Sequence, residues 1–131
     1  RSDDDARTWR SIADGLPSDF GFPIVTHPHR PDVVYGFPLV ADERRFPPEG
    51  LCRVYRSEDA GESWTALSAG LPAGFWTAVM RDAMCTDDAD PAGVYFGSRS
   101  GEVYGSGDGG DSWELITSHL PDVLSVRAAV V

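Results

Sequence analysis

Apolar residues occur along the chain in short runs that are separated by Gly, Pro, Asp and Ser. No segment keeps the spacing of an amphipathic helix over a length that could bury one, whereas short apolar runs between turn residues are typical of β-strands. The pattern therefore predicts an all-β chain. The expected strands cover residues 21–26, 33–39, 52–56 and 64–67, and then 76–85, 94–98, 102–106 and 113–116.

An eight-residue motif with the pattern S-x-D-x-[GA]-x-[ST]-W occurs three times. Its copies are octet 1 (residues 2–9), octet 2 (residues 57–64) and octet 3 (residues 106–113). An apolar residue follows each Trp by three positions, and Leu-Pro follows by seven and eight. Self-similarity at a period of about 50 residues is typical of repeat architectures.

Each octet is expected to form the hairpin between the third and fourth strands of a repeat unit. The Asp and Ser side chains can bond backbone amides of their own turn, Gly supplies a positive φ, and Trp covers the turn. Ala6 replaces Gly in octet 1, which costs roughly 1 kcal/mol if its φ is positive. The structural positions are Ser2, Asp4 and Trp9; Ser57, Asp59, Gly61 and Trp64; and Ser106, Asp108, Gly110 and Trp113.

The octet pattern resembles the Asp-box, or bacterial neuraminidase repeat, of β-propeller proteins. That family includes sialidases, xyloglucan-degrading glycosidases, sortilin-type receptor ectodomains and photosystem assembly factors. The resemblance implies a β-propeller of four-stranded antiparallel blades in which the octet joins the third and fourth strands of each blade. It implies little about activity, because members share the turn and not the chemistry.

The repeats supply about two and a half blades. Residues 1–20 would be the last strand and octet of a preceding blade, residues 21–72 and 73–121 two blades, and residues 122–131 a strand closing onto another blade. A propeller needs roughly four to eight blades. We therefore expect this chain to be the C-terminal part of a longer propeller, with the remaining blades or a second copy as its partner.

Composition narrows the classes of partner. The formal net charge is −10 and the chain contains no Lys, which argues against binding to nucleic acid or to anionic membrane surfaces. No apolar run is long enough for a membrane span. No signal peptide is visible, but the chain begins inside an octet without Met, so localisation is unknown; the cytoplasm is favoured and secretion stays open.

Patterns that could bind a metal or cofactor do not have the required context. The G-x-G-x-x-G match at residues 105–110 falls within octet 3 and opens no helix. His27 and His29, and the aspartates at 87, 88 and 90, lack the spacing of zinc or calcium sites. Cys52 and Cys85 are expected to be buried free thiols. The sequence therefore predicts no metal and no cofactor.

The candidate ligand-binding face is the end of the blades opposite the octets. Arginines beside aromatic residues there could bind an acidic sugar or a peptide carboxylate. The candidate residues are Phe20, Arg44, Arg45, Phe75, Trp76 and Arg99. We expect a non-enzymatic module for binding or assembly, with a glycan or a protein as ligand. The alternative is a glycoside hydrolase of sialidase or other Asp-box type, although the octet aspartates lie a blade apart and cannot form its carboxylate pair.

Overall fold

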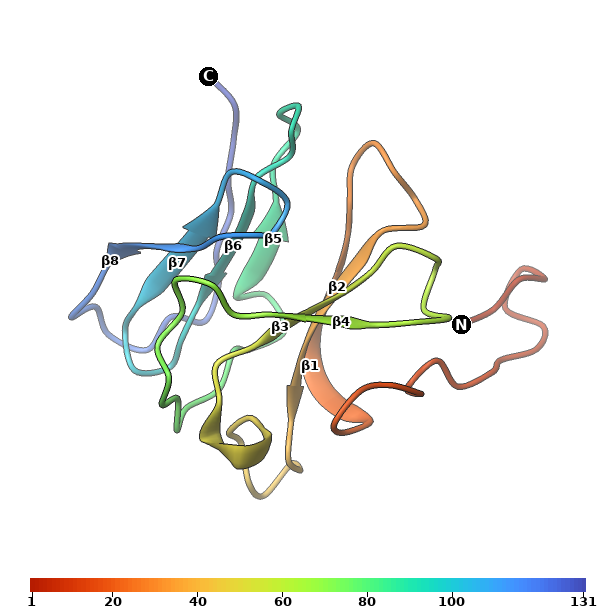
Figure 1. Ribbon diagram of the computed structural model, residues 1–131, viewed down its shortest axis with the longest axis horizontal. Helices are drawn as coiled ribbons and strands as arrows, with labels where there is room; N and C mark the ends of the chain where they lie inside the picture. Colours follow the sequence, from red (N-terminus) through yellow and green to blue (C-terminus); the bar gives the residue numbers. More distant parts are fainter.

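The computed structural model describes residues 1–131 and shows an all-β protein with two four-stranded antiparallel sheets (Figure 1). In each sheet the strands are neighbours in the order in which they occur along the chain. The first sheet contains β1 (Phe20–Thr26), β2 (Val34–Leu39), β3 (Val54–Ser57) and β4 (Thr65–Leu67). The second contains β5 (Met84–Thr86), β6 (Val94–Gly97), β7 (Val103–Ser106) and β8 (Glu114–Thr117).

The predicted hairpins are confirmed. Octet 2 joins β3 to β4, and octet 3 joins β7 to β8. The registers of the two hairpins correspond, because Arg56 lies opposite Thr65 and Gly105 opposite Glu114. The loop from β2 to β3 carries the single 3₁₀ turn η1 (Pro48–Gly50).

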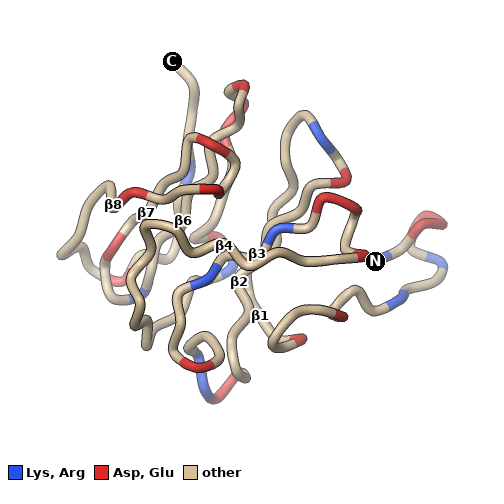
Figure 2. The backbone as a smooth tube through the Cα atoms, in the orientation of Figure 1, with Lys and Arg blue, Asp and Glu red and all other residues tan.

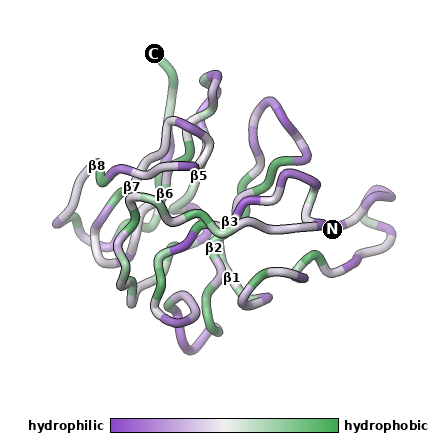
Figure 3. Tube along the Cα trace, viewed as in Figure 1, coloured by the Kyte–Doolittle hydropathy of each residue, from purple (hydrophilic) through white to green (hydrophobic).

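The core lies between the two sheets. The Phe96 ring is its centre, with the rings of Phe37 and Trp113 at 5.5 and 5.2 Å between centroids. Val54 from the first sheet and Val79 from the connection to the second belong to the same buried cluster. Figure 3 shows the hydrophilic residues concentrated in the loops around this core. The two sheets therefore share one apolar interior.

Three predicted strands differ from the structure. The expected strand at 76–85 is only β5, because Ala78, Val79 and Ala83 are buried in an irregular connection and their apolar character reflects burial rather than pairing. Residues 123–130 form no strand beyond one parallel bridge between Asp82 and Ser125.

The third difference is at the N-terminus. Residues 1–20 contain no strand before Phe20. Arg1 and Arg10 exchange two backbone hydrogen bonds of 2.7 and 2.9 Å across octet 1, as the ends of a hairpin do. No further strand lies beside this pair, so the ladder does not extend.

The first strands of the successive units lie side by side. Strand β1 packs beside β5, and the C-terminal segment in turn lies beside Asp82, which precedes β5. The Val126 amide donates to the Asp82 carbonyl at 2.9 Å. In Figure 1 the N-terminal segment, the first sheet and the second sheet follow one another across the molecule. None of the helical structure is long and apolar enough to cross a membrane.

Candidate functional site

The octet turns are held by a closed network of side-chain hydrogen bonds. In octet 2 the Ser57 hydroxyl donates to Asp59 Oδ1 at 2.8 Å and accepts the Gly61 amide at 2.7 Å. Asp59 Oδ1 also accepts the Ser63 amide at 2.8 Å, while Asp59 Oδ2 accepts the Ser63 hydroxyl at 2.6 Å. Both carboxylate oxygens are thus used within the turn.

The same network occurs in the other two octets. In octet 3 the corresponding bonds join Ser106, Asp108, Gly110 and Ser112, and in octet 1 they join Ser2, Asp4, Ala6 and Thr8. Each octet also has positive φ at its fourth and fifth positions. Ala6 adopts φ 65°, so the strain expected at this position is present.

Hydrogen bonding keeps the octet carboxyl groups ionised. The Ser63 hydroxyl, followed by the Ser63 amide and the Ser57 hydroxyl, lowers the pKa of Asp59 to about 2. The Ser106 hydroxyl, together with Ser112, lowers the pKa of Asp108 to about 2. The pKa of Asp4 is also lowered, chiefly by the Thr8 amide. These groups act as acceptors and hold no proton for general acid chemistry near neutral pH.

An arginine before each of the first two octets reaches the next octet. Arg1 Nη1 donates to the Ala60 carbonyl at 2.9 Å and lies 3.4 Å from Glu62 Oε1. Arg56 Nη1 donates to the Gly109 carbonyl at 2.9 Å and to Asp111 Oδ1 at 2.9 Å. Ala60 and Gly109 occupy the fourth octet position, and Glu62 and Asp111 the sixth. The arginine contacts at the two junctions between repeat units therefore correspond.

Apolar packing at these junctions also repeats. A Cβ added to Gly61 would lie 2.7 Å from Ile12 Cδ1, and one added to Gly110 would lie 2.8 Å from Leu67 Cδ1. Ile12 and Leu67 both follow their octet Trp by three residues. Trp64 Nε1 also donates to the Ile12 carbonyl at 2.8 Å, a bond that does not repeat, since Trp113 Nε1 is buried without a hydrogen-bond partner. We call this combination the repeat junction: an apolar residue and an arginine of one unit against the octet of the next.

The three octet tryptophans differ in burial according to their neighbours. Trp113 is buried in the core and Trp64 is half-buried, whereas Trp9 is 72% exposed. Leu115 and Ile116, which end the third unit, are 53% and 57% exposed. No other segment of the structure packs over Trp9 or Ile116 in the way that the adjacent units cover Trp64 and Trp113. The expectation that Trp covers its turn therefore depends on the adjacent unit.

The residues of the predicted ligand face make different contacts. Phe20 packs against Phe22 at 5.3 Å, and Arg45 lies over the Phe22 ring while its guanidinium pairs with Asp42 at 2.7 Å. Arg99 pairs with Asp122 at 2.7 Å, and Arg44 is exposed on the loop after β2. Phe75 is only 5% exposed and belongs to the core, although it also lines the hollow beside Trp76.

Trp76 is the most accessible aromatic residue of that predicted face. Its side chain is 71% exposed, and its indole lies directly over Gly50, where an added Cβ would be 2.4 Å from the ring. The Phe46 ring packs beside it at 5.3 Å. The indole is therefore fixed in orientation while one face stays open.

A hollow of about 270 Å³ adjoins Trp76 at the turn between β6 and β7. Ser100, Glu102 and Tyr104 line its other side. Glu102 Oε2 accepts the Ser100 hydroxyl at 2.7 Å and also the Ser98 hydroxyl, and these bonds, Ser98 first, lower the pKa of Glu102. Sequence reasoning missed Glu102 and Tyr104. The short turn predicted at 97–101 indicated where the loop between the two strands lies, but not which side chains line the hollow beside it.

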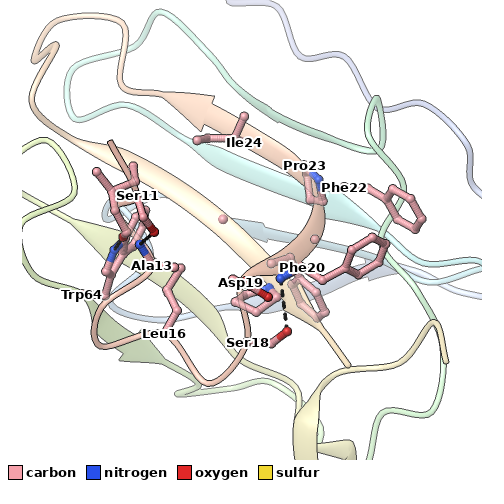
Figure 4. Close-up of a pocket in the computed structure, with 15 residues that line it drawn as sticks. Ser11, Ala13, Leu16, Ser18, Asp19, Phe20, Phe22, Pro23, Ile24 and Trp64 are labelled. Carbon is pink, nitrogen blue, oxygen red and sulfur yellow. Dashed lines mark hydrogen bonds between the residues drawn. The ribbon is translucent and has the colours of Figure 1, made fainter. Parts of the chain in front are cut away.

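A larger groove of about 420 Å³ lies between the N-terminal segment and β1 (Figure 4). Trp64, Ala13 and Leu16 form one side, and Phe20 and Pro23 are on the other. Among the polar groups of the groove, Ser18 Oγ accepts a hydrogen bond from the nearby Phe20 amide at 3.1 Å. The groove is an apolar gap beside the first sheet, with no cluster of catalytic groups.

The other sequence candidates occupy turns. His29 lies within hydrogen-bond distance of the Asp88 and Ala89 carbonyls, which brings together the two turns discussed for metal binding. No group of three or more His, Cys, Asp or Glu side chains has an arrangement that could hold a metal ion. Figure 2 shows acidic residues distributed over many loops rather than gathered at one site.

The cysteines are both free. Cys52 is buried, which raises its pKa to about 12. Cys85 is only half-buried, so the expectation of two buried thiols was wrong for this residue.

Comparison with models of known protein families found no match. A comparison with curated proteins also found no similar sequence.

Proposed function

We propose that this chain is a non-enzymatic Asp-box β-propeller module, built for assembly through its repeat junctions and for ligand binding on the face opposite the octets. The observation that carries the proposal is the repetition of the junction. Arg1 and Arg56 each donate at 2.9 Å to the carbonyl at the fourth position of the following octet. The same contact between successive units is expected when repeats stack only on their neighbours.

The order of the strands supports a radial arrangement. In a propeller the first strand of every blade lies next to the axis, so the first strands of neighbouring blades are adjacent. Here β1 packs beside β5, and the segment around Ser125 lies beside Asp82 in a parallel bridge.

The carboxyl groups favour a binding role over glycoside hydrolysis. A general acid in a glycosidase needs a raised pKa. Every carboxyl group of this chain with a clear pKa shift is shifted downward, and Asp59, Asp108 and Glu102 all accept serine hydroxyls. No observation therefore favours the hydrolase alternative.

The hollow beside Trp76 has the chemistry of a site for a neutral glycan. An open indole face can pack against the apolar face of a sugar ring, and Glu102 and Ser100 supply hydrogen-bonding groups at the rim. The Glu102 carboxylate disfavours an anionic ligand, because a like charge would be placed beside it. We therefore assign neutral oligosaccharides as the ligand class.

Fluorescence titration with a panel of neutral oligosaccharides tests the proposal. Saturable change of Trp emission is expected, and Trp76→Ala should weaken it at least about ten-fold because the stacking surface is lost. Trp9→Ala is a matched control, since Trp9 is equally exposed at 72% but lies on octet 1. Hydrolysis of fluorogenic glycosides by the chain, abolished by changing one acidic residue, would contradict the proposal.

A further inference from the structure

We propose that two copies of this chain associate head to tail, with octet 1 of one copy packed against the outer side of the β7–β8 hairpin of the other. The inference rests on the proposed function, because it extends the repeat junction beyond the chain. Figure 1 places the N-terminal segment and β8 at opposite ends of the molecule. A closed pair would contain four four-stranded sheets, with the octet 1 hairpin of each copy between its own first sheet and the second sheet of the other copy.

The two apolar surfaces that would form a third repeat junction are both present in the chain, and both are exposed to solvent. At the internal junctions, Ile12 packs on Gly61 and Leu67 on Gly110. The residue at the corresponding position of the third unit is Ile116, which is 57% exposed beside Leu115. The corresponding acceptor is octet 1, where Trp9 is 72% exposed. Each end of the chain therefore presents one half of a contact that the chain makes twice internally.

The charges at both ends of the chain differ from those at the internal junctions. Both internal junctions join an arginine before one octet to an acidic residue at the sixth position of the next. The position before octet 3 holds Gly105 instead of arginine, and the sixth position of octet 1 holds Arg7 instead of an acid. An arginine at position 105 would face Arg7 across the junction. Gly105 therefore avoids a like-charge contact with Arg7.

A carboxylate at the C-terminal end supplies the opposite charge for Arg7. Glu114 lies directly across from Gly105 in the β7–β8 pair, just as Thr65 lies across from Arg56. Residues paired across antiparallel strands project from the same face of a sheet. Glu114 therefore projects from the face of the second sheet that corresponds to the Arg56 face of the first sheet. In the first sheet, that face forms the internal junction.

Arg7 and Glu114 are free for this contact. Both are exposed, and neither takes part in the ion pairs of the chain. In the associated pair, Glu114 of one copy would contact Arg7 of the other. In this contact the octet carries the arginine and the preceding unit carries the acid, whereas at the internal junctions the octet carries the acid. Octet 1 therefore cannot take the place of octet 2 or octet 3 at an internal junction, because its Arg7 would lie beside an arginine.

Sedimentation equilibrium of the complete chain over a range of concentrations tests the proposal. The wild-type chain is expected to dimerise, whereas Arg7→Glu and Glu114→Arg should each weaken the dimer at least about ten-fold through like-charge contacts. The double variant Arg7→Glu/Glu114→Arg should recover the wild-type affinity to within about three-fold. Arg44→Glu makes the same charge change on a loop outside the interface and should leave the dimer unchanged.

Two further results separate this inference from the proposed function. Trp9→Ala should abolish dimerisation and keep oligosaccharide binding, while Trp76→Ala should keep dimerisation and lose binding. A wild-type chain that stays monomeric up to about 1 mM would overturn the inference, since that limit leaves less than about 4 kcal/mol for association. Dimerisation that survives Trp9→Ala, or a double charge variant that is not restored, would overturn the assigned interface.

Discussion

Replacing Ser57 by Ala should destabilise the chain much more than the same change at Ser2. The Ser57 side chain is fully buried, and its hydroxyl accepts the amide of buried Gly61 at 2.7 Å and donates to Asp59 at 2.8 Å. Alanine leaves the Gly61 amide without a partner in a place that water does not reach. An unsatisfied buried group of this kind costs about 1–3 kcal/mol.

Ser2 makes the same bonds in octet 1, at 2.8 Å from the amide of Ala6 and 3.0 Å to Asp4. Ser2 is only half-buried and Ala6 is exposed, so water can replace the lost hydroxyl. We expect Ser2→Ala to cost less than about 1 kcal/mol, since an exposed hydrogen bond contributes little net stability. The comparison isolates burial, because the geometry of the two turns is the same.

Urea denaturation followed by Trp fluorescence and circular dichroism measures both variants at one protein concentration. Fixing the concentration matters because association raises apparent stability. The m-value should be unchanged, so that a shift of the midpoint reports stability alone. Equal losses for Ser57→Ala and Ser2→Ala would show that burial of the octet does not set its contribution, and would refute the reasoning.

Two other predictions concern pH and thiol reactivity. The folded-state pKa of Asp59 and Asp108 is about 2, below the ordinary 3.8, so their contribution to stability is complete above about pH 4 and is lost as pH falls toward 2. The urea midpoint should therefore fall between pH 5 and pH 2. The double variant Asp59→Asn/Asp108→Asn should show a smaller decrease over the same range. Burial raises the pKa of both thiols, that of Cys52 to about 12, but Cys85 is only half-buried and should react with a thiol reagent at pH 8 much faster than the buried Cys52. Modification of both sites at the same rate, measured by mass spectrometry of partly labelled protein, would contradict this.

The hairpins and octet turns could be predicted from sequence because their causes are local. Ser, Asp and Gly at fixed spacing define the turn through their own hydrogen bonds and positive φ, and the strands on either side follow from it. The boundaries of β3, β4, β7 and β8 accordingly lie within a few residues of those expected. The strand at 76–85 was predicted too long because buried apolar residues have the same composition in a strand and in a buried connection.

The contacts between units could not be predicted, because they join residues about 50 positions apart. Arg56 gives no local indication that its guanidinium reaches Gly109 and Asp111. For the same reason Phe75 and Trp76 are adjacent in sequence but differ in role, one in the core and the other over Gly50. The positions of Gly105 and Arg7 become informative only when the internal junctions are known.

The most direct test of the repeat junction is the coupling between Arg56 and Asp111 in a double-mutant cycle. The Arg56 side chain is only 15% exposed and bonds both the Gly109 carbonyl and Asp111, so Arg56→Met should destabilise the chain more than Asp111→Asn. If the junction joins the two sheets, the loss of unfolding free energy in the double variant should differ from the sum of the two single losses by about 0.5–1 kcal/mol in urea denaturation. Additive effects, with Arg56→Met no more destabilising than an exposed substitution, would contradict assembly through this junction.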